Sequence, residues 1–154
     1  MPAAHIEEQR NAPMRVLFLC THNSSRSQMA EGFLRARGGS DCAAFSAGTR
    51  PSVIHPLAIR AMSELGIDIS ETAGRHSKGL DAYAGQRFDL VVTVCDSAAE
   101  ECPFFPGARR QEHWSFPDPS AVTGSEEQRL EAFRRVRDAI GERIDEFLAA
   151  NRTD

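Results

Sequence analysis

A short polar loop joins an apolar segment to a helical segment near the start of the chain. Residues 16–19 (Val-Leu-Phe-Leu) are apolar without a break, and residues 20–26 (Cys-Thr-His-Asn-Ser-Ser-Arg) are mostly small and polar. An unbroken apolar run predicts a strand that is buried on both faces, as in a parallel sheet covered by helices. The turn from such a strand into a helix points backbone N–H groups inward. The loop is therefore typical of a site for a tetrahedral oxyanion.

Two side chains at the ends of this loop add chemistry to the predicted anion site. Arg26 presents a planar fork that grips two oxygens at once, and the positive dipoles keep Cys20 as a thiolate, the form that attacks. The alternative is a core cysteine followed by a charged residue by chance, but the position between strand and helix favours the anion site. We expect the oxyanion to be bound by Thr21, His22, Asn23, Ser24, Ser25, Arg26 and Ser27.

Length and charge restrict the class of protein. The chain has 154 residues, of which 41% are hydrophobic, enough for one domain with one core. Its net charge of −4 provides no general field for nucleic acid or an anionic membrane. No apolar stretch approaches the about 20 residues that span a bilayer, and the first residues lack the apolar core of a secretory signal. We predict a flexible tail at residues 1–13, a domain at 14–150, and a cytoplasmic location.

The four cysteines are Cys20, Cys42, Cys95 and Cys102. Without a secretory signal, such cysteines are more often catalytic, metal-binding or core residues than structural disulfides. Their spacing does not fit a metal site, so we predict none. Cys42 lies in a predicted strand with no activating polar neighbour, which indicates an inert thiol. The other pair, Cys95 and Cys102, is either redox-active or one core thiol with an incidental cysteine before Pro103.

The apolar patterns alternate between strands and helices. Strands are predicted at 15–19, 42–46, 88–94 and 109–114, and helices at 27–37, at 56–65, near 80–84 and from a capping box at 125–128. This order predicts a single α/β domain with a four-stranded parallel sheet and helices on both faces. Ligands of such sheets bind beyond the carboxyl ends of the strands, where Cys20 and Cys95 both fall.

A third candidate group lies in a proline-rich loop. Asp118 stands between Pro117 and Pro119, which hold the chain extended and rigid. Its carboxyl group is a general acid if it faces the anion site, and otherwise a solvated turn aspartate. The sequence of the loop alone leaves both readings open.

Several segments together closely resemble one known family. They are residues 16–32 (Val-Leu-Phe-Leu-Cys-Thr-His-Asn-Ser-Ser-Arg-Ser-Gln-Met-Ala-Glu-Gly), 46–49 (Ser-Ala-Gly-Thr), 92–96 (Val-Thr-Val-Cys-Asp), 102–103 (Cys-Pro) and 113–119 (His-Trp-Ser-Phe-Pro-Asp-Pro). The family is that of the arsenate reductases built on the low-molecular-weight tyrosine phosphatase fold. The resemblance runs from about Met14 to the last predicted helix.

The resemblance implies reduction of arsenate to arsenite by three thiols, in arsenic detoxification. Cys20 attacks arsenate held by Arg26, and Asp118 protonates the oxygen that leaves. Cys95 then attacks Cys20, and Cys102 attacks Cys95 and carries the disulfide outward. Thioredoxin would reduce this disulfide, with glutaredoxin and a low-molecular-weight thiol as the alternative donor. By the same analogy, hydrogen bonds of Asn23 and Ser27 pin the loop, and no cofactor is bound.

Two other functions compete with this one. A low-molecular-weight protein tyrosine phosphatase shares the adduct chemistry, but Ser120, Ala121 and Val122 replace the aromatic residues that usually follow the aspartate–proline pair in such phosphatases. A non-catalytic oxyanion-binding module would not need three aligned thiols. We expect a monomer with no nucleic-acid or membrane partner.

Some relatives are thought to hold a potassium ion near this loop with an acidic side chain. Counting back from Cys95 without gaps places Lys78 near that position. We predict that its ammonium group replaces a bound potassium ion.

Overall fold

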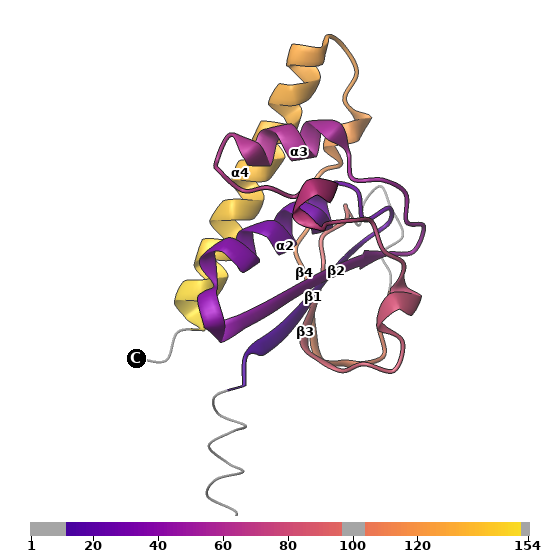
Figure 1. Cartoon of the computed structure of the whole chain (residues 1–154), viewed down its shortest axis with the longest axis vertical. Helices are drawn as coiled ribbons and strands as arrows, with labels where there is room; N and C mark the ends of the chain where they lie inside the picture. Colours follow the sequence, from indigo (N-terminus) through magenta and orange to yellow (C-terminus); the bar gives the residue numbers. More distant parts are fainter. Residues whose placement is uncertain (1–11, 97–103, 152–154) are drawn as a thin grey trace, which may run out of the picture.

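A computed structural model describes residues 12–96 and 104–151 of the chain. The predicted tail at 1–13 lies almost wholly outside the described residues, and Cys102 lies outside them as well. Four parallel strands form one sheet, which lies beside the helices in Figure 1. Their order is β2-β1-β3-β4. They are β1 (Met14–Cys20), β2 (Cys42–Gly48), β3 (Phe88–Thr93) and β4 (Ala108–His113).

The register of the sheet brings the carboxyl ends of all four strands to one edge. Cys20 pairs with Gly48 of β2, Leu19 with Thr93 of β3, and Thr93 in turn with His113 of β4. β2 runs two residues beyond its predicted end because it pairs with β1 along the whole of that strand. Whatever follows Cys20, Thr93 and His113 therefore gathers at this edge.

The two faces of the sheet are covered differently. Three α-helices lie on one face (Figure 1): α2 (Arg26–Arg37), α3 (Pro56–Ser63) and α4 (Glu126–Ala150). The other face is covered, within the described part of the chain, by the 3-10 helix η3 (Leu80–Tyr83) and the aromatic residue Phe105. β1 serves both layers, since Phe18 packs on the α-helical side and Leu17 on the other. Such double burial explains its unbroken apolar sequence.

The helix ends follow local signals with one exception. The predicted capping box is present, with reciprocal hydrogen bonds between Ser125 and Gln128 at the start of α4. α3 ends at Ser63, two residues before its predicted end, and Leu65 is 44% exposed. The apolar spacing wrongly included Leu65, because the chain turns away at Gly66, whose φ is +77°.

α2 is buried far more completely than its sequence predicts. Its first nine residues are all buried, including Gln28 at 0% and Glu31 at 2% exposure. Buried polar groups are costly unless they form hydrogen bonds, so these side chains need partners inside the protein. They find them around the loop that precedes α2.

α3 and α4 are joined by an ion-pair cluster at the surface. Glu64 accepts hydrogen bonds from Arg134 at 2.7 Å and from Arg137 at 2.7 Å. The hydrogen bond from Arg134 is the largest cause that lowers the pKa of Glu64 to about 2.

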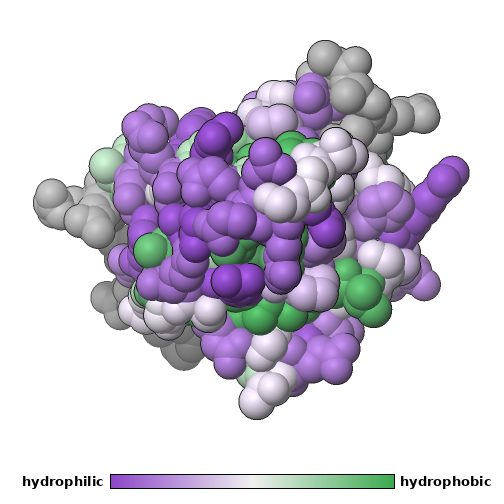
Figure 2. All heavy atoms as spheres, turned by 90° about the horizontal axis from the view of Figure 1, so that it is seen from above, coloured by the Kyte–Doolittle hydropathy of each residue, from purple (hydrophilic) through white to green (hydrophobic). Residues whose placement is uncertain are grey.

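The surface of the molecule seen in Figure 2 is mostly hydrophilic, with hydrophobic residues in small separate patches. No helix within the described ranges has the length and apolar character that a membrane span requires.

Candidate active site

The loop between β1 and α2, residues 20–26, is held from outside by its carbonyl groups. We call it the nucleophile loop. Three of its carbonyl oxygens accept hydrogen bonds from neighbouring segments: Thr21 from the Arg50 amide at 2.8 Å, His22 from Ser77 Oγ at 2.8 Å and Ser24 from the His55 amide at 2.9 Å. In a trans peptide, the N–H of the following residue points in the direction opposite to the carbonyl group. The amides of His22, Asn23 and Ser25 are thereby turned inward, as an anion cradle requires.

Cys20 sits at the bottom of this cradle with donors around its sulfur. It is 3% exposed, the Asn23 amide donates to Sγ at 3.2 Å, and Ser27 Oγ lies 2.8 Å from Sγ. The Asn23 amide and the Ser27 hydroxyl are both groups that can donate a hydrogen bond to this sulfur. Ser25 Oγ is buried and has no hydrogen-bond partner among the described residues, so its hydroxyl is available to an oxyanion in the cradle.

The end of β2 leaves just enough room for this loop. A Cβ on Gly48 would stand 2.6 Å from the carbonyl oxygen of Thr21 and 2.8 Å from the amide nitrogen of Asn23. Backbone atoms cannot yield to such contacts cheaply. Asn23 itself has φ of +51°, a left-handed conformation that asparagine tolerates better than most residues. Glycine at 48 and asparagine at 23 are thus both explained by the shape of the loop.

Arg26 and Asp118 come together from distant parts of the chain. Arg26 Nη1 donates to the carbonyl oxygen of Phe116 at 3.1 Å, and its Nη2 lies 3.9 Å from Asp118 Oδ2. The other oxygen, Asp118 Oδ1, accepts from the Ser120 amide at 2.9 Å and caps the 3-10 helix η4 (Pro119–Ala121). The two readings of Asp118 are therefore compatible, since one oxygen holds the turn while the other faces Arg26.

Cys95 follows β3 beside the nucleophile loop. The Val94 amide donates to the carbonyl oxygen of Leu19 at 2.9 Å, which continues the β1–β3 pairing up to the residue before each cysteine. Adjacent strands lie about 4.8 Å apart, so Cys95 leaves the sheet next to the start of the loop. Cys95 is 0% exposed and disulfide-bonded, whereas Cys20 and Cys42 are free. The predicted site residue Cys102 lies outside the described residues.

Cys42 lies at the opposite end of the sheet, at the first position of β2. Burial, and to a smaller extent the negative charge of Asp41, raise the pKa of the Cys42 thiol. A protonated thiol is a poor nucleophile. This agrees with the prediction that Cys42 is inert.

A buried carboxylate below the nucleophile loop is surrounded by cations. Glu31 forms ion pairs with Arg35, with Arg75 at 3.3 Å and with Lys78 Nζ at 3.9 Å, and it accepts a hydrogen bond from Ser46 Oγ. Burial lowers the pKa of Lys78, and the charge of Glu31 opposes that shift. With three cationic groups around one carboxylate, these residues do not fit an additional potassium ion. Metal-ligating clusters of three or more His, Cys, Asp or Glu are absent from the described residues.

Two residues of this region were missed by sequence reasoning. Gln28 belongs to the motif that carries the resemblance, but it was given no role. Arg75 stands after Gly74 in a turn, where an arginine is ordinarily solvated, yet it is 7% exposed and donates to Gln28. A glutamine inside an otherwise small and apolar stretch of a buried helix was the available signal. No local pattern marks Arg75.

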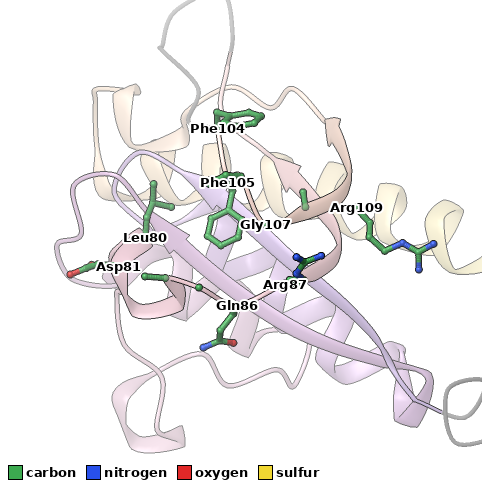
Figure 3. Close-up of a pocket in the computed structure, with 12 residues that line it drawn as sticks. Leu80, Asp81, Gln86, Arg87, Phe104, Phe105, Gly107 and Arg109 are labelled. Atoms are coloured by element: carbon green, nitrogen blue, oxygen red, sulfur yellow. The ribbon is translucent and has the colours of Figure 1, made fainter. Parts of the chain in front are cut away.

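A hollow of about 670 Å³ lies elsewhere, among Leu80, Gln86, Arg87, Phe105 and Arg109 (Figure 3). Several of its lining residues stand at the amino ends of β3 and β4, the edge opposite to Cys20. The hollow is therefore separate from the nucleophile loop.

Comparison with known proteins places this site in a family. Residues 15–154 match the model of the low molecular weight phosphotyrosine protein phosphatases, and the chain belongs to that family. Within it, the chain is 46% identical over 132 residues to an arsenate reductase of Halalkalibacterium halodurans, covering 86% of this chain and 93% of the relative.

Solved structures agree with the sequence comparison. A structure described as an arsenate reductase in reduced state superposes with a TM-score of 0.71 at 34% identity, over 89% of this chain and 98% of that one. A thioredoxin-dependent arsenate reductase of Corynebacterium glutamicum superposes with a TM-score of 0.62 at 28% identity, over 94% of this chain and 65% of that one. The predicted fold, a single domain with a four-stranded parallel sheet, is confirmed; among the described residues the helix on the second face is the short 3-10 helix η3.

Proposed function

We propose that this protein reduces arsenate to arsenite with electrons from its own thiols. The observation that carries the proposal is the placement of Cys20 at the end of β1 and of Cys95 two residues beyond the adjacent strand β3, with Cys95 in a disulfide and Cys20 free. A two-electron reduction without a metal or flavin requires a dithiol. Two relatives, at 46% and 45% identity, are named arsenate reductases, which supports the same substrate.

In the first proposed step the Cys20 thiolate attacks the arsenic(V) centre. A sulfur–arsenic bond forms, one arsenate oxygen leaves as water, and Asp118 supplies a proton to it. Arg26 and the inward amides of the nucleophile loop bind the remaining oxygens. The position of Asp118 Oδ2 beside Arg26 supports this assignment.

The second step moves two electrons to arsenic. The Cys95 thiolate attacks the Cys20 sulfur, a disulfide forms between them, and the electron pair of the sulfur–arsenic bond stays on arsenic, which leaves as arsenite. Cys102 then attacks Cys95 and releases Cys20 as a thiolate. We propose Cys102 as the disulfide partner of Cys95 in the oxidised protein, because the other two cysteines are free.

A dithiol protein completes the cycle by reducing the disulfide between Cys95 and Cys102. We propose thioredoxin as this donor, since a relative in Corynebacterium glutamicum is described as thioredoxin-dependent. A cycle that depends on thioredoxin works in a reducing compartment, so the proposed location is the cytoplasm. The donor is tested by comparing turnover with thioredoxin, its reductase and NADPH against glutaredoxin with glutathione.

The replacement Cys95→Ser tests the proposal, with Cys42→Ser as the matched control. Arsenate turnover in the thioredoxin system is expected to disappear in Cys95→Ser and to persist in Cys42→Ser. An aryl phosphate assayed on the same proteins separates the phosphatase alternative, which uses Cys20 but not Cys95. If Cys95→Ser keeps both activities of the unaltered protein, the reductase assignment is wrong.

A further inference from the structure

A chain of four hydrogen bonds connects Arg75 to the sulfur of Cys20. Arg75 Nη2 donates to Gln28 Oε1 at 2.9 Å, and Gln28 Nε2 donates to Asn23 Oδ1 at 2.9 Å. Asn23 Nδ2 donates to Ser27 Oγ at 2.8 Å, and Ser27 Oγ lies 2.8 Å from Cys20 Sγ. We call Arg75, Gln28, Asn23 and Ser27 the polar relay.

Groups with a single hydrogen-bonding role fix the direction of this relay. The backbone amide of Lys78 can only donate, and it donates to Asn23 Oδ1 at 2.8 Å, which turns the Asn23 amide nitrogen to the other side. The carbonyl oxygen of His76 can only accept, and it accepts from Gln28 Nε2 at 2.9 Å. The Arg75 guanidinium has no acceptor, so it must face Gln28 Oε1. Both side-chain amides are therefore oriented without ambiguity.

The direction of these hydrogen bonds determines the role of the Ser27 hydroxyl. Its oxygen accepts from Asn23, and a Cys20 thiolate has no proton to donate, so the Ser27 O–H donates to the thiolate and every bond of the relay then points from the cation toward the sulfur. We propose that Arg75 is a positioning residue that, through Gln28, Asn23 and Ser27, polarises the Ser27 hydroxyl toward Cys20 and favours its thiolate.

Burial makes such a relay effective. Asn23, Ser27 and Gln28 are 0% exposed and Arg75 is 7% exposed, so water competes little with these bonds. Hydrogen bonds in chains strengthen one another in a low dielectric, and a charged donor at one end increases the effect. The charged or titratable groups that face Arg75 are Glu31, Arg35, Lys78, Tyr83 and Asp68.

The inference goes beyond the proposed function, because it concerns how Cys20 is ionised rather than what Cys20 attacks. It holds equally if the protein is a reductase or a phosphatase. Its test therefore reads the thiolate directly and uses neither arsenate nor thioredoxin.

The test measures the pH dependence of alkylation of Cys20 by iodoacetamide, followed by mass spectrometry of the peptide that contains it. In the reduced protein with Arg75→Gln, the midpoint of the alkylation curve is expected to rise by about one pH unit. At a pH below both midpoints, such a rise lowers the rate of Cys20 alkylation about tenfold. The control is Arg35→Gln, which removes an equal charge from the same carboxylate of Glu31 but has no bond to Gln28.

A second variant keeps the charges and breaks the relay. Gln28→Met has nearly the same volume, retains Arg75 and Glu31, and removes the donor to Asn23, so the midpoint is expected to rise as in Arg75→Gln. An unchanged midpoint in Gln28→Met, or an equal rise in Arg35→Gln, would overturn the proposal. Thermal unfolding of each variant shows whether it is folded. If Arg75→Gln does not fold, the alkylation midpoint of Gln28→Met tests the proposal by itself.

Discussion

Cys20 and Cys42 are two free thiols on neighbouring strands of one sheet, and their surroundings differ in every respect that governs reactivity. Cys20 ends β1 at the carboxyl edge, with the Asn23 amide and Ser27 hydroxyl at its sulfur. Cys42 begins β2 at the other edge, with Asp41 beside it and a raised pKa. The difference teaches that two thiols of one sheet acquire different surroundings from the strand end at which they lie, which is why we propose Cys20 and not Cys42 as the nucleophile.

The largest difference between the two thiols is expected in turnover. Cys20→Ser should lower arsenate turnover at least about 10³-fold, because a hydroxyl is a much weaker nucleophile than a thiolate and cannot form the disulfide. Cys42→Ser should retain the turnover of the unaltered protein. Steady-state assays with thioredoxin measure both. Equal losses in the two variants would remove the distinction that we draw.

Replacement of Asp118 tests whether the Cys20 end of the sheet includes a general acid. Asp118→Asn keeps the cap on the Ser120 amide but has no proton to give, so kcat should fall about 10²-fold with a smaller change in KM. Ser120→Ala, which removes the hydroxyl hydrogen bond to Asp118 Oδ1 but keeps the carboxyl group and the Ser120 amide, serves as the control. If the two variants have the same kcat, Asp118 acts only as the cap of η4.

Gly48 tests how far the geometry of the loop, rather than its chemistry, supports Cys20. Gly48→Ala brings a Cβ against Thr21 and Asn23 and should displace the loop, with a loss of about 1–3 kcal/mol in unfolding free energy and a fall in kcat/KM. The control Gly85→Ala has a positive φ but open space around it. It should lose stability and leave kcat/KM unchanged. An unaltered kcat/KM in Gly48→Ala would mean that the loop adapts.

Cys42 also permits a test by pH. Because its pKa is raised, alkylation of Cys42 should stay slow at neutral pH and accelerate only above pH about 9, the ordinary value from which the shift starts. Cys20, which has the Asn23 amide and the Ser27 hydroxyl at its sulfur, should be labelled faster than Cys42 at pH 7. Peptide mapping after timed alkylation measures the two rates in one sample, and faster labelling of Cys42 at pH 7 would contradict the comparison.

The smallest change in turnover is expected when potassium is exchanged for sodium. Lys78, Arg75 and Arg35 already neutralise Glu31, so turnover should be the same in potassium and sodium chloride at equal ionic strength. A strong activation by potassium would show that the ammonium group of Lys78 does not replace the ion.

Much of this architecture is predictable because its signals are local. The apolar run of β1, the turn into α2 and the capping box at Ser125 are each encoded within a few neighbouring residues. The role of Arg75 is not, since its partner Gln28 is 47 residues away in sequence. The dual position of Asp118 likewise depends on how its loop packs against Arg26, 92 positions earlier by numbering, which no local pattern encodes.

The reductase account rests on a bond between Cys20, which ends β1, and Cys95, which follows β3, and this bond can be trapped. With Cys102→Ser, the reduced protein should release arsenite in a single turnover and then stop with Cys20 and Cys95 joined in a disulfide. Mass spectrometry should detect one such disulfide for each arsenite released. Arsenite released without that disulfide, or arsenate left unreduced with Cys20 and Cys95 as free thiols, would contradict the account.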